Sequence, residues 1–330
     1  MFDHHLTEFA GLPVFEYRMQ GAEQDPSAVL AALRTPKAYA WRLSDDGGYG
    51  TSSEYEGIEE YFGRFSAESA APEVAALVIG NFDALMGTDS RLVRDMLVAQ
   101  AHRLTGVRSL FFADLTYEES EVSWLSHGDL GPLLTAFPSL ERLAVRGTGD
   151  MALSVDGHPA LRSLVLQGGG LPAVLARRVV AGDYPALEHL ELWLGVSDYG
   201  GDTTPGDLAP VLDGKAHTGV RSLGLRNAEK TDVWVRALAD APLLDRLENL
   251  DLSMGTLTDE GARILLDAAG FRELNRLDLH HHYMTEGMEK RVLEAFSAAG
   301  VEIDASGREE PHDSSDEYEW RSRYYPSVTE

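Results

Sequence analysis

Three consecutive histidines, His280-His281-His282, and two aspartates, Asp251 and Asp278, are the residues most typical of a chemical site. Imidazole is a common ligand of transition metals, and paired carboxylates can share a proton or bind a cation. Successive residues that leave a strand point to different sides, so the three histidines are not expected to converge on one ion. We therefore predict structural roles for the histidines, a solvated acidic face around the aspartates, no metal site and no catalytic residue.

Other catalytic motifs are absent from the sequence. Gly168-Gly169-Gly170 follows an apolar run, but it lacks the Lys-Ser/Thr of a phosphate loop and the spacing of a dinucleotide fingerprint. The chain has no G-x-S-x-G elbow, no H-E-x-x-H pattern and no cysteine, which removes serine elbows, zinc helices and thiol nucleophiles. We therefore predict no cofactor and no enzymatic activity.

A short repeated pattern supplies the elements that would position these residues. It reads apolar-x-x-apolar-x-apolar, and its last two apolar residues alternate, as expected of a strand with one buried face. The residues after each strand have helical spacing, as in 258–270, where Thr258 is placed to cap the helix and Gly270 to end it. Such units cannot bury their apolar faces alone, so neighbours must stack. The eight copies begin at Val74, Val107, Leu140, Leu161, Leu187, Val220, Leu247 and Leu274.

By these residues the chain resembles the leucine-rich-repeat superfamily. The copies recur every 21 to 33 residues, which is close to or slightly beyond the roughly 20–29 residues of one leucine-rich repeat. Leu247-x-x-Leu250-x-Leu252 followed by Leu257-Thr258-Asp259-x-Gly261-Ala262 is similar to the ribonuclease-inhibitor type, over roughly Pro72 to Ile303. The opening residues 5–14 are also similar to uncharacterised bacterial leucine-rich-repeat proteins. The resemblance implies an α/β, right-handed solenoid with a curved parallel sheet on the concave side and helices on the convex side. The family's buried Asn or Cys after the strand is replaced here by Phe82, Leu115, Thr148, Gly169, Gly195, Ala228, Gly255 and His282.

We expect three parts in the chain. Residues 1–71 would form an N-terminal capping segment with a candidate irregular first repeat, residues 72–304 the repeat array, and residues 305–330 an acidic C-terminal tail that contains tyrosines. Two interpretations of the tail stay open: a disordered or loosely packed segment, or a segment that docks on a partner or on the concave face. The second rests on its apolar and aromatic residues, which are Tyr318, Trp320, Tyr324, Tyr325 and Val328.

Residues that alternate with the core positions define the outward face of the strands. Trp193 close to Arg146 and Arg226 resembles the composition of a binding hot spot, where aromatics and arginine dominate affinity. The alternative interpretation is that the N-terminal segment or the C-terminal tail covers these residues. The predicted binding residues on the concave face are Phe111, Arg142, Arg146, His189, Glu191, Trp193, Arg226, Asp251, Arg276, Asp278 and His280.

Composition restricts the partner. The net charge of −26 and a pI near 4.7 argue against nucleic acid, which is bound through Lys and Arg, and against an anionic membrane surface. No apolar run approaches the roughly 20 residues of a membrane-spanning helix. The lack of cysteine and of a basic, apolar leader at Met1 leads us to expect a cytoplasmic protein.

These observations predict a non-catalytic scaffold that binds a protein or peptide partner on the concave face. The alternative is an enzyme subunit, or a binder of a small molecule or carbohydrate, that uses the region of Glu191, Trp193, Asp251, Asp278 and His280. A broad open surface would favour the scaffold, and a closed pocket with convergent polar groups would favour the alternative.

Overall fold

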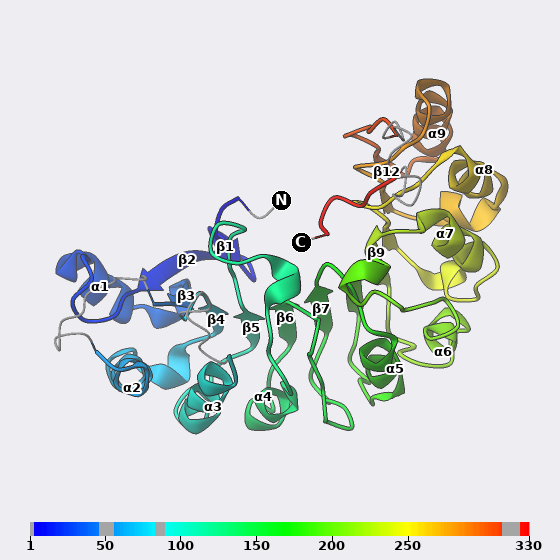
Figure 1. Ribbon diagram of the computed structural model, residues 1–330. Coiled ribbons are helices and arrows are strands. Elements are labelled where there is room, and N and C mark those ends of the chain that lie inside the picture. Colours follow the sequence, from blue (N-terminus) through cyan, green and yellow to red (C-terminus); the bar gives the residue numbers. More distant parts are fainter. Residues whose placement is uncertain (1–2, 46–55, 83–89, 312–323, 330) are drawn as a thin grey trace. The chain divides into compact units, whose positions relative to one another are not determined.

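The computed structural model describes residues 3–45, 56–82, 90–311 and 324–329. Strands alternate with helices along the chain, which divides into two compact units (Figure 1). Unit 1 comprises Met1–Val165 and Gly182–Ala186, and unit 2 comprises Leu166–Ala181 and Leu187–Glu330. Strand β7 (Ser163–Gln167) contains the boundary between them.

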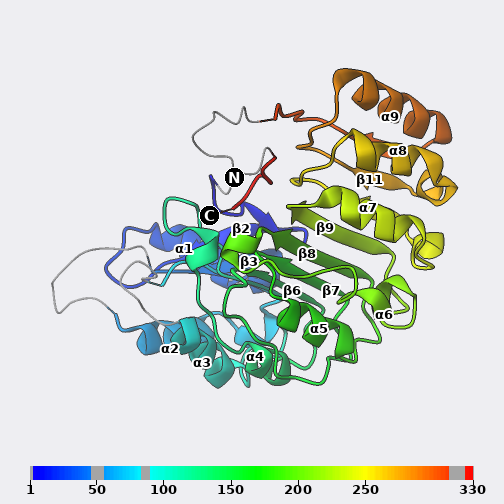
Figure 2. The ribbon, with the colours of Figure 1, turned by 45° about the vertical axis from the view of Figure 1, so that its right-hand side comes forward.

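Unit 1 begins with an antiparallel hairpin and continues as parallel strands in chain order. Helices α2, α3 and α4 lie in one layer on one side of these strands (Figures 1 and 2). The strands are β1 (Glu8–Phe9), β2 (Leu12–Tyr17), β3 (Ala40–Leu43), β4 (Ala76–Ile79), β5 (Ser109–Phe112) and β6 (Arg142–Arg146). The helices are α1 (Pro26–Leu33), α2 (Ile58–Glu68), α3 (Ser90–Gln100) and α4 (Gly131–Ala136).

Unit 2 repeats the same arrangement of parallel strands and helices. Leu190, Leu223, Leu250 and Leu277 pair with one another across successive parallel strands, and all four side chains are buried. The strands are β8 (His189–Gly195), β9 (Ser222–Ala228), β10 (Asn249–Asp251), β11 (Arg276–Asp278) and β12 (Glu302–Asp304). The helices are α5 (Ala173–Ala181), α6 (Ala209–Leu212), α7 (Thr231–Ala239), α8 (Asp259–Asp267) and α9 (Glu286–Ala299).

Local sequence explains where these helices begin and end. The hydroxyl of Thr258 accepts a hydrogen bond from the amide of Glu260 at 3.1 Å and caps α8, as predicted. The prediction that α8 reaches Gly270 is wrong: the helix ends at Asp267, and a 3₁₀ turn over Ala269–Glu273 follows. This tighter turn buries Phe271 completely, which the continued helix period does not anticipate.

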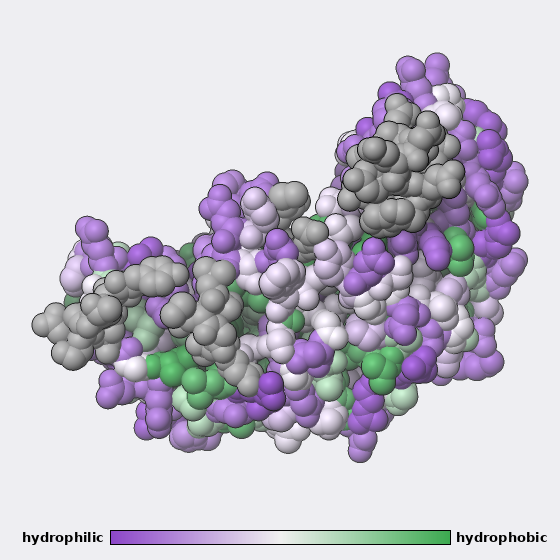
Figure 3. All heavy atoms as spheres, viewed as in Figure 1, coloured by the Kyte–Doolittle hydropathy of each residue, from purple (hydrophilic) through white to green (hydrophobic). Residues whose placement is uncertain are grey.

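One short parallel strand per repeat, followed by a helix or a 3₁₀ turn, is the architecture of an α/β leucine-rich-repeat solenoid. The predicted fold class is therefore confirmed. Among the helices of the described residues, none has both the length and the apolarity needed to cross a bilayer. Exposed apolar side chains on the helical side include Val174 on α5 and Val233 on α7. Hydrophilic residues cover much of the face shown in Figure 3.

Candidate binding surface

The outward side of the unit 1 strands is apolar and covered. Five small or apolar residues on this side, among them Val78 and Phe111, form a cluster against which Leu6, Phe9 and Leu12 of the N-terminal segment pack. The rings of Phe9 and Phe111 meet edge to face, with centroids 5.8 Å apart. Phe111 is only 4% exposed, so it cannot contribute to an open surface. The N-terminal segment packs against the cluster that contains Phe111, which is the alternative interpretation given above.

A buried ion network lies beside this cluster. Asp114 is fully buried and accepts hydrogen bonds from a guanidinium nitrogen of Arg42 and, at 3.1 Å, from the amide of Leu6. Arg146 Nη1 lies 3.5 Å from the same carboxylate, and its guanidinium stacks 5.3 Å from the Phe111 ring centre. Burial lowers the pKa of Arg146 to about 10. Arg146 is therefore internal.

Asp114 is a structural residue that the sequence analysis missed. Its sequence signal is an acidic residue placed directly after an apolar strand, and its partners come from distant repeats. Of the predicted binding residues in unit 1, only Arg142 is exposed. Unit 1 thus offers little of the predicted surface.

In unit 2 the predicted residues do come together, around Glu191. Its Oε1 accepts a hydrogen bond from Trp193 Nε1 at 2.7 Å and lies 3.3 Å from Arg226 Nη1. His189 Nε2 lies 3.7 Å from Glu191 Oε2. The paired strand supplies Gly224 opposite Glu191, and a β-carbon there would lie 2.8 Å from Glu191 Cγ, so the glycine leaves room for the carboxylate side chain.

The electrostatics of Glu191 favour the charged form. Burial raises the pKa of this carboxyl, but the nearby His189 imidazole, the Arg226 guanidinium and the Trp193 hydrogen bond together hold the pKa below its usual range. Arg226 also lies over the Trp193 ring, 5.1 Å from its centre. Trp193 is consequently 3% exposed: alternation predicts its direction, but its neighbours bury the ring.

The network continues across the next strands. Arg226 Nε lies 3.3 Å from Asp251 Oδ2, and Asp251 pairs in register with Asp278. Burial raises the pKa of Asp251. Asp278 in turn bonds His280 Nδ1 at 2.7 Å and lies 3.5 Å from Arg276 Nη2. We call these outward residues of unit 2 the polar face, and its members are His189, Glu191, Arg226, Asp251, Arg276, Asp278 and His280.

The histidine triplet does not converge. His282 is fully buried, with Nε2 bonded to the Ala305 carbonyl at 2.9 Å, and burial lowers its pKa. His280 is instead on the polar face, where Asp278, His280 and Asp304 each place one potential ligand atom within 4.8 Å of the others. Oxygen and imidazole donors of this kind suit a divalent cation, but the Asp278–His280 hydrogen bond and Arg276 already satisfy Asp278.

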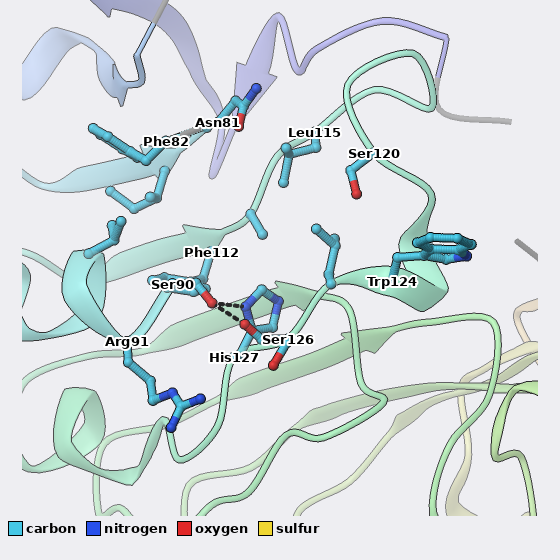
Figure 4. A pocket seen from close by; sticks show the side chains of 15 residues that line it. Asn81, Phe82, Ser90, Arg91, Phe112, Leu115, Ser120, Trp124, Ser126 and His127 are labelled. Atoms are coloured by element: carbon cyan, nitrogen blue, oxygen red, sulfur yellow. Dashed lines mark hydrogen bonds between the residues drawn. The ribbon is translucent and has the colours of Figure 1, made fainter. Parts of the chain in front are cut away.

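A separate pocket of about 320 Å³ lies in unit 1, lined by Phe82, Phe112 and Leu125 among others (Figure 4). Ser90 Oγ lies 2.9 Å from His127 Nδ1 within it. The imidazole is buried, its Nε2 bonds the Arg146 carbonyl at 2.6 Å, and burial lowers the pKa of His127. Both ring nitrogens are thus engaged, which is the arrangement of a structural histidine.

The C-terminal residues 324–329 return to unit 2. Asn227 Oδ1 accepts a hydrogen bond from the amide of Val328 at 2.9 Å, and Asn227 Nδ2 donates one to the Val328 carbonyl. The amide of Ser327 donates to the Met254 carbonyl at 2.8 Å. Val328 is one of the predicted docking residues of the tail, whereas Asn227 is not among the predicted site residues. Tyr318 and Trp320 lie outside the described residues.

One comparison shows that this fold is shared with a bacterial protein of known structure. A protein of Bacteroides fragilis with a crystal structure is 28% identical, with a TM-score of 0.73, and the match covers 82% of this chain and 73% of that one. Matches to an internalin from Listeria monocytogenes (15% identity, TM-score 0.35, 86% and 84% covered) and a leucine-rich-repeat protein from Leptospira interrogans (10%, 0.20, 86% and 100%) carry no argument. No family model and no curated protein matches the chain.

Proposed function

We propose that this chain is a non-catalytic interaction scaffold that binds a protein or peptide partner through the polar face of unit 2. One observation carries the proposal: parallel strands hold a row of charged side chains whose positions are fixed by their neighbours but whose outer atoms reach solvent. Arg276 and His280, for example, have 52% and 34% of their side chains exposed. Preorganised groups of this kind lose little side-chain entropy on binding.

The charges on the polar face indicate the kind of partner. Arginines and aspartates alternate across β9, β10 and β11, so the face offers both signs within a few residues. Complementary charges on a partner would set its orientation and speed its association. A protein surface or peptide with mixed charge fits this pattern better than a uniformly anionic polymer does.

Two observations count against the alternative of a small-molecule or carbohydrate binder. Trp193 has no exposed ring face on which a sugar could stack, because Arg226 lies over it. The carboxylates of Glu191 and Asp278 are each engaged by hydrogen bonds within the polar face. Such engaged groups position one another and leave little capacity to bind or activate a substrate.

Capture from an extract of the cells in which the chain is native tests the proposal. Arg276→Glu reverses one charge on the polar face, and Arg263→Glu makes the same change on α8, where Arg263 also has a carboxylate neighbour, Asp259 at 3.7 Å. We expect a partner that the unchanged chain and Arg263→Glu retain and Arg276→Glu loses. Equal retention by both variants would reject the polar face as the binding surface.

A further inference from the structure

The C-terminal segment crosses three successive repeats of unit 2 at equivalent positions. Equivalent residues of three repeats, Asn227 near the end of β9, Met254 after β10 and His281 after β11, contact Val328, Ser327 and Tyr325 respectively. His281 Nε2 lies 3.1 Å from the Tyr325 carbonyl. One contact per repeat means that the segment is extended, because a compact turn could not span the two strand spacings of about 5 Å each that separate the first contact from the third.

These three residues share a backbone conformation that side chains rarely adopt. Their φ angles are 54°, 63° and 58°, in the left-handed region. Gly195, the last residue of β8, also has a left-handed φ, 64°, and it pairs in register with Ala228, the residue after Asn227. A non-glycine residue with such a φ is strained, and such strain is typical of positions with a function. In the last three repeats the strained positions are the ones that hold the C-terminal segment.

Recognition of the segment uses its main chain. Asn227 binds both polar main-chain groups of Val328, and the Tyr283 hydroxyl accepts from the amide of Tyr325 at 3.1 Å and donates to its carbonyl at 2.9 Å. Pro326, which has no amide hydrogen, is buried, and so is Val328 two residues later. Main-chain hydrogen bonds with alternate side chains buried are the pattern by which proteins bind extended peptides.

Asn227 is incomplete without this occupant. Its side chain is fully buried, and apart from Val328 the partner of its amide nitrogen is the Gly168 carbonyl at 3.5 Å, which is at the limit of a hydrogen bond. This burial is that of the side chain with the segment in place, and departure of the segment would cost Asn227 both hydrogen bonds to Val328. An extended peptide from another source would restore both hydrogen bonds.

From these contacts we infer that Asn227, Met254, His281 and Tyr283 form a peptide-binding groove, and that residues 324–329 are its resident ligand. The ligand class is an extended segment of another protein with an aromatic residue, a proline two positions later and a β-branched aliphatic residue two positions after the proline. The aromatic residue would take the place of Tyr324, whose ring lies 5.0 Å from that of Tyr283. A partner must compete with the tethered segment, whose effective concentration is on the order of millimolar. The groove borders the polar face, since Arg226 Nη2 donates to Met254 Sδ at 3.1 Å. Different residues make up the two surfaces, and the peptide assay below measures the groove alone.

Fluorescence anisotropy with a labelled peptide of residues 324–330 tests the groove. Val328 is buried, so we expect Val328→Asp to release the C-terminal segment from the full chain. The released chain should then bind the peptide saturably. The unchanged chain should bind the same peptide about a hundredfold more weakly, because the tethered segment competes. A peptide with Asp in place of the valine is the control and should not bind.

Two further variants, made in the Val328→Asp chain, assign the contacts. Asn227→Asp keeps the side-chain volume but sets a carboxylate against the peptide carbonyl, and we expect binding to weaken at least about tenfold. Met254→Gly keeps the main-chain carbonyl that the peptide uses, so binding should persist. Thermal melting of each variant checks its fold.

Three results would overturn the inference. One is a Val328→Asp chain that melts like the unchanged chain and yet does not bind the peptide saturably. Another is binding that Asn227→Asp leaves unaltered. The third is a dimer of the unchanged chain that Asn227→Asp dissolves, since the occupant would then be the C-terminal segment of a second copy.

Discussion

Asn227 and Val328 are 101 residues apart in the chain, and the side-chain amide of Asn227 binds the main-chain amide and carbonyl of Val328. The contact joins the end of β9 to the C-terminal segment within unit 2. In unit 1 the N-terminal segment has a comparable place, since Phe9 packs on Phe111. Both chain ends thus use surface that the strands of their own unit provide.

Hydrogen exchange should report the Asn227–Val328 contact directly. The amides of Val328 and Ser327 donate to Asn227 and Met254, so we expect slow exchange at both in the unchanged chain. Asn227→Ala should release the Val328 amide and cost about 1–3 kcal/mol of folding free energy, because a buried hydrogen-bonding group is lost. Exchange at Val328 as fast as in a free peptide, before any substitution, would contradict the contact.

Asp114→Asn should strongly destabilise unit 1. Removing the charge takes away the buried carboxylate that Arg42 and Arg146 share, and breaking a buried ion pair in this way costs about 3–5 kcal/mol. Urea denaturation measures the loss. Glu118→Gln removes the same charge at an exposed position nearby, and it should change stability by less than about 0.5 kcal/mol. Similar effects of the two substitutions would show that the buried network is unimportant.

Phe9→Ala should uncover the apolar cluster of unit 1. Phe9 contacts Phe111 edge to face and is partly buried, so we expect a loss of about 1–3 kcal/mol and stronger binding of a dye that fluoresces on apolar surfaces. Leu30→Ala is the matched control, because Leu30 is 58% exposed on α1. Dye binding that rises equally for both variants would argue against coverage by the N-terminal segment.

Glu191 should make the stability of unit 2 depend on pH. Despite burial, its neighbours hold its folded-state pKa below the ordinary 4.5, so its ionised form stabilises the fold above about pH 4.5. That contribution is lost as the pH falls through the folded-state pKa. Glu191→Gln should cost about 1–3 kcal/mol at pH 7, and its deficit relative to the unchanged chain should shrink below pH 4.5.

Denaturation of both chains at several pH values checks this prediction. Glu302→Gln is the control, since the Glu302 side chain is 76% exposed. A deficit of Glu191→Gln that stays constant from pH 7 to well below 4.5 would show that the charge of Glu191 does not stabilise unit 2.

The repeat register could be predicted from the sequence because the same apolar spacing recurs, and each copy can bury its leucines only against the next. Leu223, Leu250 and Leu277 are in register for this reason. The direction of Trp193 also follows from alternation. Its burial does not, because it depends on Arg226 and Glu191 from two strands. Exposure is set by lateral neighbours, which a periodic pattern leaves unspecified.

Contacts between residues that are far apart in the chain could not be predicted from the sequence. The partners of Asp114 come from the N-terminal segment and from two other repeats, and Asn227 meets the end of the chain. No spacing rule links such residues, because loop closure brings them together only after the repeats have stacked. The left-handed backbone of Asn227 is visible only in the structure.

Site-specific photocrosslinking tests the central claim most directly, that the partner binds the polar face of unit 2. A photoreactive phenylalanine analogue at position 276 lies on that face, and one at position 233 lies on the helical side, where Val233 is 48% exposed. In extract of the native cells we predict a discrete protein adduct at position 276 and none at position 233. Adducts of equal yield at both positions, or at position 233 alone, would contradict the account.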